Sequence, residues 1–173
     1  MFMKAEHIFL RAVETQDLET LYECENNVSV WKVSNTQAPY SKEVLLQYLE
    51  SSHQDIYTNK QLRLMICLNA TNETIGTIDL FEFEPAHGRA GVGVLIFEAF
   101  RNKGYAREAL NSLINYAFTI LLLKQVFCNI SHTNTASRQL FEKLGFQLIG
   151  TKKQWNKISL NQYEDELLYQ LVQ

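Results

Sequence analysis

The fold is decided by the stretch Val94-Leu95-Ile96-Phe97-Glu98-Ala99-Phe100-Arg101-Asn102-Lys103-Gly104-Tyr105-Ala106-Arg107, in which an apolar strand runs into a polar loop that opens a helix. The start of a helix presents N–H groups without internal partners and the positive end of the helix dipole, which suits a phosphate or pyrophosphate. Gly104 allows the backbone to approach such oxygens, and Arg101, Lys103 and Arg107 add positive charge. The pattern also fits an ordinary strand-to-helix turn, and it is neither GxxxxGK(S/T) nor GxGxxG.

Segments next to this stretch show clear strand or helix spacing. Residues 62–68 alternate between apolar and other side chains, residues 74–84 form a second strand ended by Pro85, and residues 92–97 form a third. The second and third strands have a short connection, so we expect a hairpin. After the loop, apolar residues recur at helical spacing: Ala106, Ala109, Leu110, Leu113, Ile114, Ala117, Phe118 and Leu121.

The outer segments complete an order of β-α-α-β-β-β-α-β-α-β-β. Residues 8–13 read as a strand, followed by a helix capped by Thr15 and closed by Asn26 and Asn27, and by a second helix capped by Ser41. A strand at 126–131, a helix ended by Gly145 and strands at 146–149 and 166–171 follow, with Trp155 and Tyr163 between the last two. This order predicts an α+β (mixed α/β) fold with about four helices, and 173 residues predict one domain spanning 1–173.

The charge and the cysteine content of the chain disfavour several classes of function. The net charge is −3 with no run of basic residues longer than a pair, which disfavours a nucleic-acid or membrane-surface binder. Cys24, Cys67 and Cys128 form no CxxC pair and sit among apolar residues, so we expect buried free thiols and no metal or redox cofactor. Free thiols and the absence of a signal-peptide pattern at the N-terminus predict a cytoplasmic protein.

Two motifs resemble those of one family. The hexapeptide Arg101-Asn102-Lys103-Gly104-Tyr105-Ala106 resembles the acetyl-CoA motif of the GNAT superfamily, Gln/Arg-x-x-Gly-x-Gly/Ala. The segment 134–146, an asparagine followed by a short helix and Lys-Leu-Gly-Phe, is similar to the second signature of that family. Together with the first strand and helix, the resemblance covers nearly the whole chain. The nearest branches are the ribosomal-protein N-terminal (Rim-type) and bacterial spermidine acetyltransferases.

The resemblance implies where acetyl-CoA binds. In this family a mostly antiparallel sheet splays between its fourth and fifth strands, here 92–97 and 126–131. The pantetheine arm then lies along the fourth strand, on the backbone of Val94, Leu95 and Ile96. The pyrophosphate would lie on the loop, at Arg101, Asn102, Lys103, Gly104, Tyr105, Ala106 and Arg107. Asn134 would bind the cofactor arm, although an asparagine at that point is equally suited to capping a helix.

The resemblance also implies direct attack of a neutral amine on the thioester, with a proton returned to the leaving thiolate. Many members carry a tyrosine as this acid where the chain has Phe141, which fits a helix core. We expect Ser137, placed as in the ribosomal-protein branch, to substitute for it, the alternative being an exposed first-turn residue without a role.

The sequence does not identify the residue that acts as general base. Members often have a glutamate where this chain has Gly91. Asp79, Glu82 and Glu84 are the local carboxylates, each more typical of a solvated strand residue, and a chain of water molecules could serve instead. His132 lies just after the fifth strand, at the mouth of the expected cleft. A histidine in a surface loop is the simpler interpretation of this residue.

A protein N-terminus and a small amine such as a polyamine are the acceptors we expect first, and the sequence does not identify the acceptor. A polyamine pocket should be acidic, and the neutral loop 33–38 counts against it. Trp31, Tyr40 and Trp155 could line a pocket or fill the core. A non-catalytic acetyl-CoA-binding module is the alternative function, favoured by Phe141 and Gly91. The sequence leaves open whether the chain forms a homo-oligomer.

Overall fold

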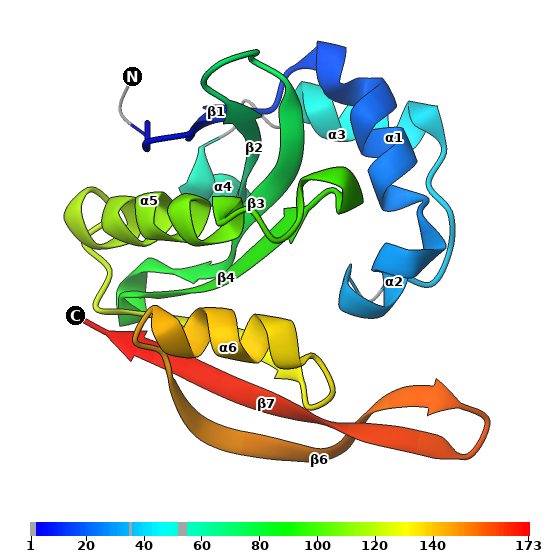
Figure 1. Cartoon of the computed structure of the whole chain (residues 1–173), viewed down its shortest axis with the longest axis vertical. Coiled ribbons are helices and arrows are strands. Elements are labelled where there is room, and N and C mark those ends of the chain that lie inside the picture. Colours follow the sequence, from blue (N-terminus) through cyan, green and yellow to red (C-terminus); the bar gives the residue numbers. More distant parts are fainter. Residues whose placement is uncertain (1–2, 35, 52–54) are drawn as a thin grey trace.

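The computed structural model describes residues 3–34, 36–51 and 55–173. The seven strands found in these ranges form one sheet, in the order β1-β2-β3-β4-β5-β7-β6 (Figure 1). The strands are β1 (Ile8–Ala12), β2 (Leu62–Leu68), β3 (Thr74–Glu84), β4 (Arg89–Ile96), β5 (Gln125–Ser131), β6 (Gln147–Ser159) and β7 (Gln162–Val172). All neighbours are antiparallel except β4 and β5. The predicted mixed α/β fold with a mostly antiparallel sheet is therefore confirmed.

Six α-helices occur in the described ranges, where the sequence predicted about four. They are α1 (Leu18–Glu25), α2 (Val28–Ser34), α3 (Lys42–Ser51), α4 (Ile56–Asn59), α5 (Tyr105–Thr119) and α6 (Thr135–Lys143). The missed helices, α2 and α4, are short and follow side-chain caps. Asn27 Oδ1 accepts from the Ser29 N–H at 3.0 Å, and Asp55 accepts from the Tyr57 and Thr58 N–H groups. None of the helices in these ranges is long and apolar enough to span a bilayer.

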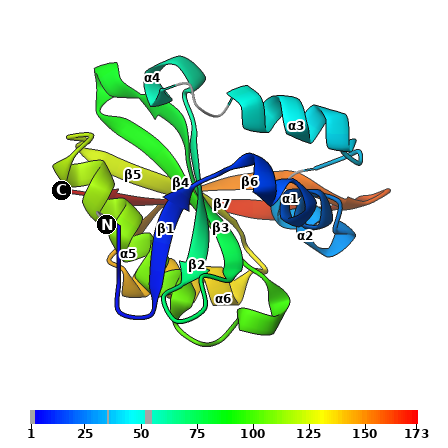
Figure 2. The ribbon, with the colours of Figure 1, turned by 90° about the horizontal axis from the view of Figure 1, so that it is seen from above.

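Helices cover both faces of the sheet (Figure 2). The amphipathic helix α5 packs Leu110 and Leu113 against a large core that includes Ile78 and Val92. The opposite face carries a smaller core in which Leu21 of α1 and Leu49 of α3 meet other buried side chains, namely Phe9, Met65 and Cys67. The alternation in β2 sends Leu64 and Ile66 to the first face and Met65 and Cys67 to the second, as strand geometry requires. Cys24, Cys67 and Cys128 are buried and free, as predicted.

Two predicted caps are confirmed and one is wrong. Ser41 Oγ accepts from the Val44 N–H at 3.2 Å at the start of α3, and Asn134 Oδ1 accepts from the Ser137 N–H at 3.1 Å at the start of α6. Thr15 does not cap α1, because it lies inside a preceding 3-10 turn, Thr15–Asp17. That turn is held by Asp17, which accepts from the Glu14 N–H and pairs with Arg11 at 2.7 Å.

Strands β6 and β7 are much longer than predicted and form a hairpin ribbon that runs along one side of the molecule (Figure 1). Trp155 and Tyr163 lie within these strands, 61% and 51% exposed, so the alternative that Trp155 fills the core is wrong. Most of β6 faces solvent, which removes the alternation of apolar and polar residues that identifies a half-buried strand.

The sheet opens between β4 and β5. These strands pair only at Arg89–Gln125, Ala90–Val126 and Gly91–Phe127. Beyond that point β4 continues against β3 as far as Ile96, and β5 continues against β7 as far as Ser131. Two parallel strands that remain in register with their outer neighbours but not with each other form a V, so the predicted splay is confirmed.

Candidate active site

The edge of β4 that faces the V is the first component of the site. Val94, Leu95 and Ile96 lie past the last pair with β5, while their other edge is hydrogen-bonded to β3. Backbone N–H and C=O groups at such an edge can take up an extended ligand as an added strand. The structure thus places these three residues where the sequence predicted contacts with the cofactor arm.

The loop before α5 is the second component. Gly104 is the N-cap of α5 with φ +86°, and its carbonyl accepts from the Arg107 and Glu108 N–H groups at 3.0 and 3.2 Å. The N–H groups of Tyr105 and Ala106 therefore precede the helical ladder and point out of its first turn. A Cβ added at Gly104 would meet nothing within 4 Å, so this side of the loop is open. Both observations fit an anion at the helix start.

The basic side chains of the loop differ in placement. Arg101, Lys103 and Arg107 are all exposed. Arg101 turns back toward β4, with Nε donating to the Ile96 carbonyl at 3.0 Å. Lys103 Nζ lies over the ring of Phe100, 5.4 Å from its centre. The Arg101 side chain therefore also lines the cavity beside β4 that is described next.

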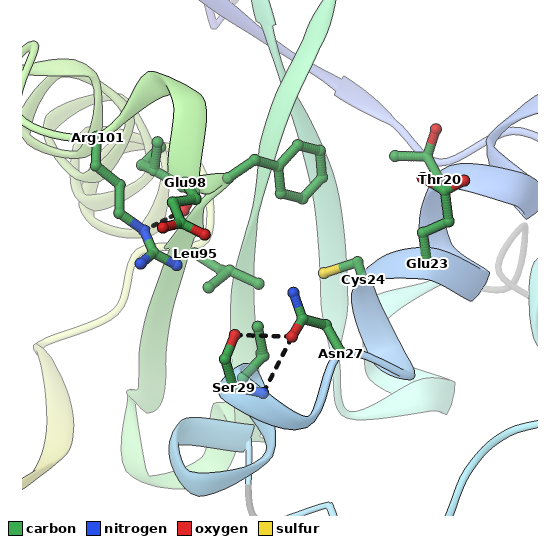
Figure 3. Close-up of a pocket in the computed structure, with 11 residues that line it drawn as sticks. Thr20, Glu23, Cys24, Asn27, Ser29, Leu95, Glu98 and Arg101 are labelled. Carbon is green, nitrogen blue, oxygen red and sulfur yellow. Dashed lines mark hydrogen bonds between the residues drawn. The ribbon is translucent and has the colours of Figure 1, made fainter.

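A cavity of about 180 Å³ is the third component (Figure 3). Of its lining, the sequence prediction named only Leu95, Ile96 and Arg101, as residues that bind the cofactor. One wall comes from α1 and the start of α2, the other from the end of β4 and the turn after it. The lining residues are Thr20, Glu23, Cys24, Asn27, Ser29, Val30, Leu95, Ile96, Phe97, Glu98 and Arg101. Two carboxylates and one guanidinium give this lining a net negative charge. Burial raises the pKa of the Cys24 thiol to about 11, so this cysteine stays protonated and is a poor nucleophile.

The aromatic residues predicted for a pocket lie elsewhere. Trp31 donates from Nε1 to the Glu25 carbonyl at 2.8 Å, and Tyr40 is 39% exposed with its backbone bonded to the Asn26 side chain. Neither lines the cavity. Polar residues of α1 and of the turn after β4 line it instead. These two segments are about 75 positions apart, so no local sequence pattern predicts that they lie together.

Helix α6 carries the residues considered for proton transfer. Asn134 caps this helix, so the capping role is confirmed, and its role in holding the cofactor stays a prediction. Ser137 is half-buried in the first turn. Phe141 is 4% exposed and meets the Phe146 ring edge-on at 5.0 Å, which confirms it as helix core.

Asp79 is not a solvated carboxylate as the sequence suggested. Its Oδ1 lies 2.7 Å from Arg63 Nε, and Arg63 Nη1 lies 2.5 Å from Glu25 Oε1 of α1. All three side chains are about one-fifth exposed or less. Burial lowers the pKa of Arg63, but the attraction of Asp79 and Glu25 outweighs it and leaves that pKa raised. A carboxylate held by a permanently charged partner is a weak candidate for the base.

The other candidate bases are peripheral. Glu82 and Glu84 are exposed, and Glu82 sits in a β-bulge with φ +47°, as expected for solvated residues. His132 is exposed just after β5, its N–H donating to the Asp165 carbonyl. A glutamate at position 91 would require the Phe81 ring to move, because a Cβ there would overlap that ring, with Cζ 2.5 Å away.

The chain matches one family model, that of the acetyltransferase (GNAT) domain, over residues 7–147. The protein belongs to the GNAT acetyltransferase family. A relative from Vibrio cholerae, a spermidine N(1)-acetyltransferase, is 30% identical over 140 residues, which are 79% of this chain and 77% of that protein. The family match and this relative identify the present protein as an N-acetyltransferase, which is an acyltransferase enzyme.

Solved structures extend the match beyond the family segment. The crystal structure of spermidine N-acetyltransferase from Vibrio cholerae in complex with CoA and spermine has a TM-score of 0.86 at 25% identity, covering 96% of this chain and 95% of that one. A dodecameric structure of the spermidine N-acetyltransferase from that organism has a TM-score of 0.79 at 28% identity, covering 96% and 94%. The similarity to the Rim-type branch stays a prediction.

Proposed function

We propose that this N-acetyltransferase transfers the acetyl group of acetyl-CoA directly to a primary amine of a small cationic molecule such as a polyamine. The observation that carries the proposal is the cavity bearing Glu23 and Glu98, which adjoins β4 at Leu95 and Ile96. The acceptor and the cofactor arm would thus share one strand. The Vibrio cholerae relative, crystallised with CoA and spermine, supports both ligand classes.

The residues present fit acetyl-CoA, which supplies a thioester that an amine can attack. The backbone of Val94, Leu95 and Ile96 holds the extended arm. The N–H groups of Tyr105 and Ala106 hold the pyrophosphate at the start of α5. Donors along β4 also stabilise the carbonyl oxygen that gains charge during transfer.

The charge of the cavity favours a small acceptor with more than one amine. A negative lining stabilises the protonated form of an amine, whereas the attacking amine must be neutral. Glu23 and Glu98 are therefore suited to bind a second, spectator ammonium group while the attacking nitrogen loses its proton to water. The neutral loop 33–38, which seemed to argue against a polyamine, adds no described residue to the lining; Asn35 lies outside the described residues.

Ser137 is the group we propose for returning a proton to the thiolate of CoA. The proposal rests on its position in the first turn of α6, one turn before the buried Phe141. Asn134 holds that turn through the Ser137 N–H.

The direct test is an acetyl-transfer screen with purified protein. Polyamines, amino acids, aminoglycosides and short peptides are offered with acetyl-CoA, and free thiol release is followed. We expect the highest kcat/KM with a linear diamine or polyamine. A preference for peptide N-termini would contradict the proposed acceptor, and no release with any amine would contradict the activity and favour a binding module.

We also propose that the chain self-associates. The dodecameric structure of the relative supports this, as does the set of apolar side chains exposed on the β6–β7 ribbon, Leu148, Ile149 and Ile158 among them. Light scattering of the purified protein measures the mass directly, and a mass of 20.1 kDa at micromolar concentration would contradict it.

A further inference from the structure

We infer that Phe81 and Phe127 limit the length of the acyl group that this enzyme accepts, an inference that rests on the proposed binding of acyl-CoA along β4. The starting observation is a strip of β4 without side chains. Gly91 and Gly93 share the face of β4 opposite Val92, which is buried in the α5 core. The ring of Phe81 in β3 lies on this strip. A Cβ at Gly91 would overlap it, and one at Gly93 would be 3.7 Å from Cε1.

Phe127 covers the same strip from the other side. It is the β5 residue paired with Gly91 in the last step before the two strands separate. Its ring meets that of Phe81 edge-on, with centres 6.0 Å apart and planes at 82°. Two rings from β3 and β5 thus lie together over bare β4 backbone, at the point where the V closes.

The acyl end of the donor is directed toward this point. With its pyrophosphate at Gly104, the arm passes Ile96, Leu95 and Val94 in turn, so the thioester comes next to Gly93. From Ile96 to Gly93 the strand extends about 10 Å, at about 3.3 Å per residue. Continuing along the same line, the acyl chain reaches Gly91.

Two other directions for a longer chain are closed. The paired segments Arg89–Gly91 and Gln125–Phe127 close the V ahead of the chain. On the α5 side, Val92, Val126 and Cys128 are at most 2% exposed within the core. On the remaining face of β4, the acceptor cavity lies beside Leu95 and Ile96, and the two rings cover the strip at Gly91 and Gly93. An acetyl group needs little space there, whereas each further methylene must displace a ring.

The test measures binding and needs no acceptor. Dissociation constants for CoA, acetyl-CoA, propionyl-CoA and n-butyryl-CoA are determined by calorimetry for the unmodified protein and for Phe81→Ala. Butyryl-CoA should bind the unmodified protein at least tenfold more weakly than acetyl-CoA. In Phe81→Ala that ratio should fall by about tenfold, since each buried methylene contributes roughly fourfold to affinity. The dissociation constant of CoA should change less than about twofold.

Phe83→Leu is the matched control. Phe83 lies on the same strand but in the α5 core, fully buried and edge-on to Tyr57. This variant should lower the melting temperature and leave the order of acyl-CoA affinities unchanged. If Phe81→Ala does not fold, Phe81→Leu and Phe127→Leu replace it, with an expected fall in the ratio of about threefold each.

The outcomes separate the two proposals. An unchanged acyl preference in folded variants that still bind CoA would overturn the role of the rings and leave the cofactor site in place. Equal affinity of the unmodified protein for acetyl- and butyryl-CoA would do the same. Failure of CoA itself to bind the unmodified protein would overturn the proposed cofactor and, with it, this inference.

Discussion

The two sides of β4 are built in different ways. On the cofactor side, the free strand edge and the start of α5 offer mainly backbone groups, and Gly104 leaves the start of α5 free of a side chain. On the acceptor side, side chains define the site. Glu23, Glu98 and Arg101 are the charged residues of the cavity lining, and the Glu25–Arg63–Asp79 cluster joins α1 to β2 and β3. Backbone sites tolerate side-chain changes, so we expect the cofactor to be held in common with relatives while acceptor choice varies.

The largest effect is expected on the acceptor side, from Arg63→Met. This change leaves Glu25 and Asp79 as like charges in a largely buried site, which should lower the free energy of unfolding by about 3 kcal/mol. Urea denaturation at neutral pH measures it, with Lys42→Met as control, because Lys42 pairs with Glu19 on the surface. Equal losses in the two variants would show that the cluster is no more than a surface ion pair.

Gly104→Val addresses the cofactor side. The valine must adopt φ near +86° and place its side chain where phosphate oxygens would approach, so the dissociation constant of CoA should rise about 100-fold, or about 2.7 kcal/mol. Strain at this φ also lowers stability, by about 1–2 kcal/mol. Gly104→Asn is the control, because asparagine adopts this region more readily. Unchanged CoA affinity in folded Gly104→Val would place the pyrophosphate elsewhere.

Ser137→Ala tests whether the cofactor side also supplies a side chain for chemistry. Turnover should fall roughly ten- to a hundred-fold, the low end for general acid catalysis, with CoA affinity nearly unchanged. Thr135→Ala, an exposed position in the same turn, should retain turnover. Full activity of Ser137→Ala at saturating acceptor would assign the proton to bulk water.

The smallest effect is expected at the cavity rim. Glu98→Gln and Glu23→Gln should each raise the KM for a polyamine about fivefold, or about 1 kcal/mol, because both carboxylates are exposed. The effect should weaken with added salt. Glu82→Gln, on β3 outside the cavity, serves as control. A KM that does not move in either variant would remove the carboxylates from acceptor binding.

Much of the cofactor side was predictable from the amino-acid sequence. The loop before α5, the amphipathic pattern of α5 and the Asn134 cap are local features, in which residues a few positions apart determine each other's hydrogen bonds and burial. The resemblance to the GNAT superfamily supplied the splay between β4 and β5, which no local pattern of either strand contains.

The acceptor side depended on tertiary contacts. Asp79 has the sequence environment of a solvated strand residue. The register between β2 and β3 places Arg63 opposite it, and the packing of α1 on the sheet brings Glu25 to Arg63. From the sequence, Gly91 is interpreted as the loss of a glutamate that other family members have. The structure shows that the Phe81 ring lies against the backbone of Gly91. Glu23 and Glu98 line opposite walls of one cavity although 75 positions separate them (Figure 3). Helix and strand periodicity report which face of an element is buried, but they contain no information about which distant side chain covers it.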